Sequence, residues 1–141
     1  MATDDDSPRA IIGNALARNP EAIVNTSIEL LELLANGLIG IIGEQGFDTL
    51  LYRSVHRVNL EYPWMMFDPR SRPADPEFHL LRACFEDQDV VQTRAASTLL
   101  FDTFIDILGL LIGEHLTMLI LHAALGRRGG AAKNSKEQHN G

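Results

Sequence analysis

Apolar residues recur every three to four positions along two long stretches of the chain, which is the spacing of one face of an α-helix. The first stretch carries Ile23, Ile28, Leu30, Leu31, Leu34, Leu38, Ile41 and Ile42. A further helix with an apolar side follows, marked by Phe47, Leu50, Leu51, Val55, Val58 and Tyr62. The second stretch begins after Asp87 or Asp89, either of which can cap a helix, and continues to Leu125. Because no segment alternates apolar and polar residues as a strand does, the sequence predicts an all-α helical bundle.

Helix-start and helix-breaking residues mark the shorter elements. Ser7 followed by Pro8 is typical of a helix N-terminus and predicts a short helix that ends at Arg18. Asn19-Pro20 repeats this signal at the start of the first long stretch. Residues 63–76 contain four prolines, so this segment cannot be helical throughout.

Length and composition indicate a single helical domain over residues 8–126. The chain has 141 residues, of which 45% are hydrophobic, and this is enough for a real core. After the proline-rich segment, we expect a short helix over 77–85. The tail 127–141 lacks apolar periodicity and is expected to be disordered, and residues 1–7 are expected to be flexible.

An offset of 70 residues aligns the chain with itself. It places Ile42-Gly43-Glu44 on Ile112-Gly113-Glu114, and 7 of the 35 residues in 21–55 are identical to their counterparts. One helical stripe in each half also has a similar character: Glu32, Asn36, Gly40 and Gly43 in the first, and Asp102, Asp106, Gly109 and Gly113 in the second. One interpretation is two similar halves, 8–62 and 77–126, joined by the proline-rich segment and related by a pseudo-two-fold axis in a bundle of about four main helices. The alternative is that the three-residue motif recurs by chance.

Glycines interrupt both long apolar stretches, at positions 37, 40, 43, 46, 109 and 113. A glycine inside a helix lowers the stability of the helix by about 0.5–1 kcal/mol relative to alanine, so each of these glycines is expected to have a compensating structural role. Small residues allow close helix packing, which is the interpretation we expect here. The alternative is a hinge at Gly43-Glu44 and Gly113-Glu114.

Charge and cysteine content narrow the functional class. A net charge of −7 argues against a nucleic-acid binder, because phosphate would be repelled. The single cysteine, Cys84, excludes a disulfide framework and fits the cytoplasm, and the acidic N-terminus is unlike a signal peptide. The long apolar stretches contain acidic residues, so we expect buried helices of a bundle and no membrane span. A membrane-active hairpin made of 33–51 and 104–125 is an alternative.

Residues that could support catalysis or bind a metal do not fall into a known pattern. The repeated Glu44 and Glu114 could pair across a two-fold axis, but neither is followed by the Glu-x-x-His spacing of di-metal bundles. His115 and His122 are about 10.5 Å apart along a helix, which is too far to share one ion directly. We therefore expect no metal, no cofactor and no familiar enzyme class.

Basic residues form a local patch in this acidic chain. Arg53, His56 and Arg57 are neighbours on one helix face, and Arg70 and Arg72 in the following segment could join them. Such a cluster is suited to a carboxylate or a phosphate. The alternative is a solvated face whose cations pair with acidic residues nearby in the sequence.

Large apolar residues lie beside this patch, in the run Trp64-Met65-Met66-Phe67. Such a run either packs over the end of the bundle or contacts a partner, and methionines suit an adaptable surface. We predict a non-enzymatic interaction or regulatory module that binds a protein through the arginine patch together with Trp64 and Phe67.

His56 suggests a different function. The expected bundle resembles histidine phosphotransfer modules, which are four-helix bundles of similar length with an exposed histidine on a helix. The lysine and glycine that usually follow that histidine are replaced here, since the next four residues are Arg57, Val58, Asn59 and Leu60. The resemblance implies phosphorylation of His56 as an alternative function.

The last long helix bears on the oligomeric state. Outside its acidic and glycine stripe, the stretch 90–125 is apolar nearly all round. A helix of this kind lies in the centre of a core or extends into a subunit interface. We therefore predict a homodimer.

Overall fold

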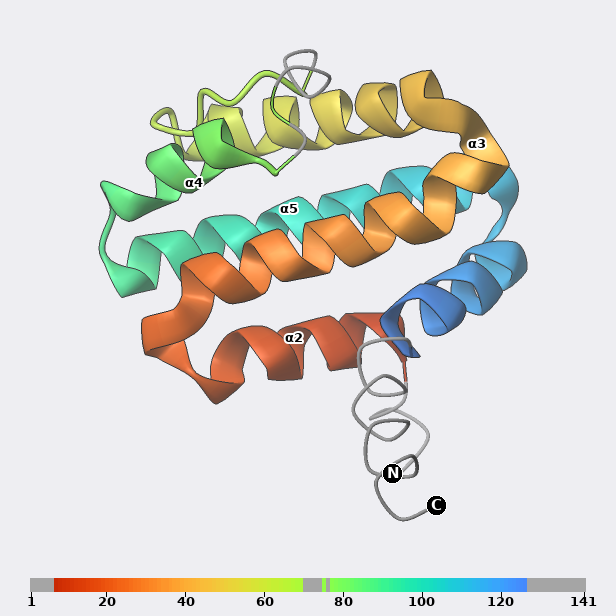
Figure 1. Cartoon of the computed structure of the whole chain (residues 1–141), viewed down its shortest axis with the longest axis horizontal. Coiled ribbons are helices and arrows are strands. Elements are labelled where there is room, and N and C mark those ends of the chain that lie inside the picture. The colour runs from red at the N-terminus through yellow and green to blue at the C-terminus, as the bar shows by residue number, and fades with distance from the viewer. Residues whose placement is uncertain (1–6, 70–74, 76, 127–141) are drawn as a thin grey trace.

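A computed structural model describes residues 7–69, 75 and 77–126 (Figure 1). Within these residues every regular element is a helix and there is no strand, which confirms the predicted all-α bundle. The expectations for residues 1–6 and for the tail 127–141 lie outside the described residues.

The described helices follow one another in a simple order. They are α2 (Pro8–Arg18), the 3-10 turn η1 (Pro20–Ala22), α3 (Ile23–Glu61), α4 (His79–Glu86), α5 (Val90–Ile112) and a helix over 114–126. α3 consists of two arms that meet at Gly43, which we name the inner arm (23–42) and the outer arm (44–61). We name the helix over 114–126 the outer helix.

The inner arm of α3 and α5 lie side by side in the middle of the bundle and run in the same direction (Figure 1). The outer arm and α4 cover one side of this central pair, and α2 and the outer helix lie on the other side. The arrangement therefore places equivalent elements of the two sequence halves on opposite sides of the central pair.

Two predicted helix starts are confirmed by their caps. The Ser7 hydroxyl accepts a hydrogen bond from the Ala10 backbone N–H at 3.1 Å, and α2 then begins at Pro8. Of the two aspartates proposed to cap the second long stretch, Asp89 does so, since its Oδ1 accepts from the Gln92 N–H at 2.8 Å. These bonds satisfy N–H groups that a helix start leaves without a partner in the helix.

α4 begins two residues later than expected because an aspartate upstream of it supplies the cap. The Asp75 carboxylate accepts from the backbone N–H groups of His79 and Leu80, both at 2.9 Å. These two bonds and the nearby His79 ring lower the pKa of Asp75, although partial burial acts in the opposite direction.

The prediction of one long helix to Leu125 is wrong. α5 ends at Ile112, the chain turns back at Gly113, and the outer helix follows. Gly113 has φ 91° and ψ 151°, and Gly43 has φ 82° and ψ 164°. Only glycine adopts this backbone region without strain. An added Cβ would meet nothing within 4 Å at either position, so these two glycines serve turns and the close-packing interpretation is wrong for them.

Close packing does explain another of the glycines. A Cβ added at Gly37 would lie 2.6 Å from the Cβ of Ala124. The inner arm and the outer helix therefore approach each other at this point more closely than two residues with side chains permit.

The core lies between the central pair and its two flanking layers. Its largest fully buried side chains include Phe47, Phe78, Phe85, Phe101 and Phe104. Phe47 of the outer arm packs on Phe104 of α5 with ring centroids 5.7 Å apart. Between the inner arm and α5, the Ser27 and Ser97 hydroxyls form a buried hydrogen bond at 2.9 Å.

Two helices are long and apolar enough to cross a membrane, judged by length and composition alone. They span Pro20–Glu61 and Val90–Ile112, and 44% and 39% of their most apolar windows are buried inside the bundle. Core helices of soluble bundles pass the same test, and the first of these two turns back on itself at Gly43.

Candidate functional site

The predicted basic residues share one exposed face of the outer arm. Arg53, His56 and Arg57 are all exposed, and they lie three or four residues apart. Arg57 Nη1 is 2.6 Å from Glu61 Oε2, so this arginine belongs to an exposed ion pair within its own helix. Leu60 lies on the same face and is 66% exposed.

A groove of about 220 Å³ lies between the outer arm and the segment 62–69. Its lining consists of Tyr52, Val55, His56, Asn59, Met65, Met66 and Phe67. Asn59 holds the segment against the helix, because its Nδ2 donates to the Pro63 carbonyl at 3.1 Å and to the Met65 carbonyl at 2.8 Å. The groove therefore has two fixed walls, one from each part of the chain.

The structure brings His56 and Phe67 together in this groove, but it places the large apolar residues differently from a simple exposed run. Trp64 packs edge-on against Phe85 with centroids 6.2 Å apart, and Phe67 packs on Phe78 at the same distance. Met65 is fully buried, whereas Met66 is 79% exposed. Trp64 and Phe67 thus anchor the segment to the bundle, and Met66 faces outward.

Sequence reasoning missed Met66 and Leu60 as surface residues. Nothing in the run Trp64-Met65-Met66-Phe67 shows which side chain points inward, because the run has no helical or strand periodicity. Arg70 and Arg72, which we predicted to join the basic patch, lie outside the described residues.

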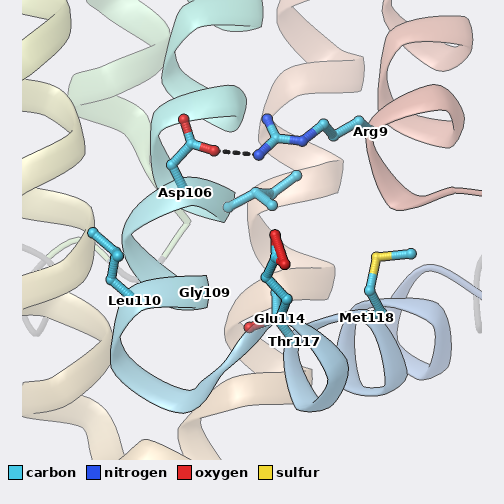
Figure 2. A pocket seen from close by; sticks show the side chains of 8 residues that line it. Arg9, Asp106, Gly109, Leu110, Glu114, Thr117 and Met118 are labelled. Atoms are coloured by element: carbon cyan, nitrogen blue, oxygen red, sulfur yellow. Dashed lines mark hydrogen bonds and ion pairs between the residues drawn. The ribbon is translucent and has the colours of Figure 1, made fainter.

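A larger pocket of about 590 Å³ lies at the junction of α2, α5 and the outer helix (Figure 2). Ile105, Leu110 and Met118 supply apolar walls. Arg9, Asp106 and Glu114 supply the charged groups. Glu114 is one of the two repeated glutamates, and the structure places it at this pocket.

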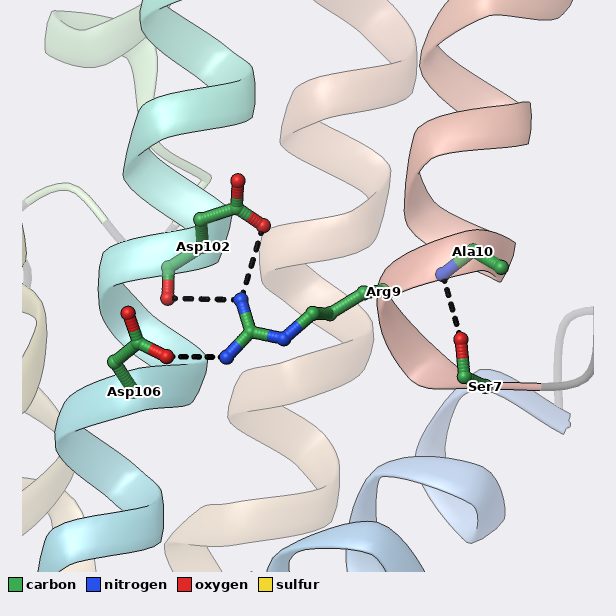
Figure 3. A network of polar contacts seen from close by, with 5 residues as sticks. All are labelled: Ser7, Arg9, Ala10, Asp102 and Asp106. Carbon is green, nitrogen blue, oxygen red and sulfur yellow. Dashed lines mark hydrogen bonds and ion pairs between the residues drawn. The ribbon is translucent and has the colours of Figure 1, made fainter. Parts of the chain in front are cut away.

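Arg9 is the centre of a polar network that links α2 to α5 (Figure 3). Its Nη1 lies 3.1 Å from Asp102 Oδ1, and its Nη2 donates to Asp106. Partial burial lowers the pKa of Arg9, but the bonds to Asp106 and Asp102 outweigh it, so the pKa is raised. The guanidinium therefore stays charged at any physiological pH.

Sequence reasoning placed Asp102 and Asp106 on one stripe but missed their partner. Arg9 is 93 and 97 residues away from them, and no local pattern signals a contact over that distance. Since the side chains of all three residues are 45–66% exposed, the network contributes about 1 kcal/mol or less to stability.

Metal-binding groups do not converge in the described part of the chain. Within residues 7–69, 75 and 77–126, no group of three or more His, Cys, Asp and Glu side chains could hold an ion. Glu44 and Glu114 directly follow the turn glycines Gly43 and Gly113, and His115 and His122 are exposed on the outer helix.

No protein family, curated protein or solved structure matches this chain. The function of the chain is therefore inferred from the geometry of the chain's own surfaces.

Proposed function

We propose that this protein is a non-enzymatic interaction module, and that a protein partner binds at the groove beside His56. One observation carries the proposal: two large apolar side chains of the groove lining, Tyr52 and Met66, are exposed, and a third, Leu60, is exposed on the adjoining basic face. Tyr52 is 44% exposed, Leu60 66% and Met66 79%. Apolar contacts flanked by cations are typical of a surface that binds a partner rather than water.

The chemistry of this surface indicates which kind of partner fits it. Met66 is flexible and polarizable, so it can adapt to an apolar side chain that enters the groove. His56 lines the other wall, and Arg53 is exposed on the same helix face beside it; both suit carboxylates of the partner. An acidic segment with one or two apolar anchors therefore fits this surface best.

We propose further that the chain consists of two similar halves with an offset of 70 residues. Three observations support this. The helix order of the first half is repeated in the second, the turn glycines Gly43 and Gly113 share one unusual backbone conformation, and Ser27 bonds to Ser97. Each pair is 70 residues apart, which is the offset of the repeated motif.

Affinity capture from a native lysate tests the partner-binding proposal. We compare the wild-type protein with the double variant Arg53→Glu/Met66→Ser and with Arg18→Glu, an exposed arginine on α2 at the opposite edge of the bundle. The proposal predicts proteins that are retained by the wild type and by Arg18→Glu but lost with the double variant. Identical retention by all three proteins would contradict it. Because the altered side chains are exposed, unchanged circular dichroism and thermal stability are expected and serve as the folding check.

Phosphotransfer through His56 is a second candidate, favoured by the exposure of this side chain on a helix. Incubation with a labelled phosphodonor decides it. Label on the wild type that is lost in His56→Ala would support this function. No label on the wild type, or equal label on both proteins, would remove it.

A further inference from the structure

The outer helix lacks the charged face of an ordinary surface helix. From His115 to Gly126 it contains no Asp, Glu, Lys or Arg. Its inward side is buried and consists of Thr117, Ile120, Leu121, Ala124 and Leu125. Its outward side includes Leu116, Met118 and Leu119, which are 40–56% exposed. A helix that is apolar all round is normally covered all round.

The first half of the chain shows that the fold does not require this apolar surface. At the offset of 70 residues, the outward positions of the outer arm are occupied by Gln45, Asp48, Thr49 and Arg53, among others. The equivalent inward residues are buried in both halves, as Phe47 and Thr117 are. The same packing is thus achieved with a largely polar outer face in the first half, apart from Tyr52 and Leu60, and an apolar outer face in the second.

More apolar surface adjoins the outer helix at its beginning. Leu110 and Leu111, the two residues before the last residue of α5, are 86% and 60% exposed. Leu110 and Met118 also line the pocket of about 590 Å³, so the apolar surface is hollowed next to Glu114 (Figure 2). A partner side chain can therefore interdigitate there instead of resting on a flat face.

We infer that a second copy of this chain covers the outer helix, with the two outer helices antiparallel across a two-fold axis. At 100° per residue, His115, Met118, Leu119 and His122 lie along the middle of the outward face. A two-fold axis between positions 118 and 119 places Met118 and Leu119 at the centre of the interface. There they contact the same two residues of the second copy, as expected in an isologous interface.

The polar groups of this face also favour a second copy over other occupants. The antiparallel arrangement brings Glu114, a hydrogen-bond acceptor at the edge of the face, to the partner's His122, whose ring N–H is a donor, at each end. An anionic lipid surface is disfavoured, because residues 110–126 contain Glu114 and no Lys or Arg. Arg127 and Arg128 follow directly in the sequence, so the test includes lipid vesicles.

The size of the surface predicts a reversible dimer. A helix of 13 residues is about 20 Å long, and a typical stable interface buries about 800 Å² on each partner. One face of a helix of this length, together with Leu110 and Leu111, is expected to bury no more than that area. The dimer is therefore expected to dissociate on dilution.

Sedimentation velocity over roughly 1 to 300 µM protein tests this inference. The wild type is expected to pass from monomer to dimer, Leu119→Glu is expected to remain a monomer, and Thr49→Glu is expected to behave as the wild type. Thr49 is the exposed counterpart of Leu119 on the outer arm, so it controls for the added charge. A wild type that is monomeric throughout, or a dimer that Leu119→Glu does not weaken, would overturn the inference.

Cross-linking tests the position of the two-fold axis without relying on a charged variant. In a Cys84→Ser background, Leu119→Cys is expected to form a disulfide-linked dimer under mild oxidation, and Thr49→Cys is not. Equal cross-linking of both variants would overturn the assigned interface. Binding of the wild type to phosphatidylcholine–phosphatidylserine vesicles, lost in Leu119→Glu, would assign this face to lipid and overturn the inference as well.

Discussion

The hydroxyl oxygens of Ser27 and Ser97 lie 2.9 Å apart and are buried between the inner arm of α3 and α5. Both residues are fully buried, so each hydroxyl depends on the other instead of on water. They are also 70 residues apart, and the helices that carry them run in the same direction. Equivalent residues of parallel helices meet in this way when a two-fold axis runs between the helices.

Removal of one of these hydroxyls leaves the other buried. We expect Ser27→Ala and Ser97→Ala each to lower the free energy of unfolding by about 1–2 kcal/mol, with the double variant losing clearly less than the sum of the two. Urea denaturation of the four proteins measures this coupling. Strictly additive losses would mean that the two hydroxyls do not interact.

The turn at Gly113 depends on a backbone conformation that alanine does not adopt without strain. Gly113→Ala is expected to destabilise the protein by about 1–3 kcal/mol, and Gly43→Ala by a similar amount. Gly40→Ala is the control, because Gly40 is helical and an added Cβ there meets nothing within 4 Å. This control is expected to be neutral or to stabilise by up to about 1 kcal/mol. Equal effects of all three substitutions on the melting temperature would contradict the assigned turns.

The contact between Gly37 and Ala124 predicts a rescue. Gly37→Ala is expected to cost about 1–3 kcal/mol, since its Cβ would lie 2.6 Å from the Ala124 Cβ. Adding Ala124→Gly removes that atom, so the double variant is expected to be more stable than Gly37→Ala alone. Thermal denaturation of the two variants compares them directly, and a double variant less stable than the single one would show that the helices do not meet here.

The cap on α4 predicts a dependence on acid. The pKa of Asp75 is lowered in the folded protein, so its stabilisation is complete above the unfolded pKa of about 3.9 and is lost as the pH falls through the lower, folded value. Asn has only one acceptor oxygen where the carboxylate uses both, so Asp75→Asn loses one of the two bonds and the charge and is expected to cost about 1 kcal/mol at pH 7. The difference in unfolding free energy between the two proteins is expected to shrink below pH of about 4. A difference that does not change with pH would contradict the role of the carboxylate.

Much of the fold could be predicted from the sequence because its determinants are local. The caps at Ser7 and Asp89, and the helical class itself, follow from residues close together in the chain. The turn at Gly113 could not be predicted in this way. Apolar residues continue at helical spacing on both sides of it, and that spacing is the same whether the chain continues or turns back.

The candidate site was predictable only in part. The basic face follows from the spacing of Arg53, His56 and Arg57 on one helix. Which residue of the segment 62–69 faces outward depends on contacts such as that of Trp64 with Phe85, which lies 21 positions further along the chain. Met66 therefore emerged as the exposed residue only from the structure.

The proposed relationship between the two halves requires that the inner arm of α3 and α5 pair at an offset of 70 residues, as Ser27 and Ser97 do.

The most direct test of this claim is disulfide formation in Ser27→Cys/Ser97→Cys, made in a Cys84→Ser background. We expect a disulfide within one chain, seen as loss of free thiols and faster migration on a non-reducing gel. The staggered control Ser27→Cys/Thr93→Cys, one helical turn out of register, is expected to keep its thiols. Free thiols in the first variant, or preferential bonding in the staggered one, would contradict the paired arrangement.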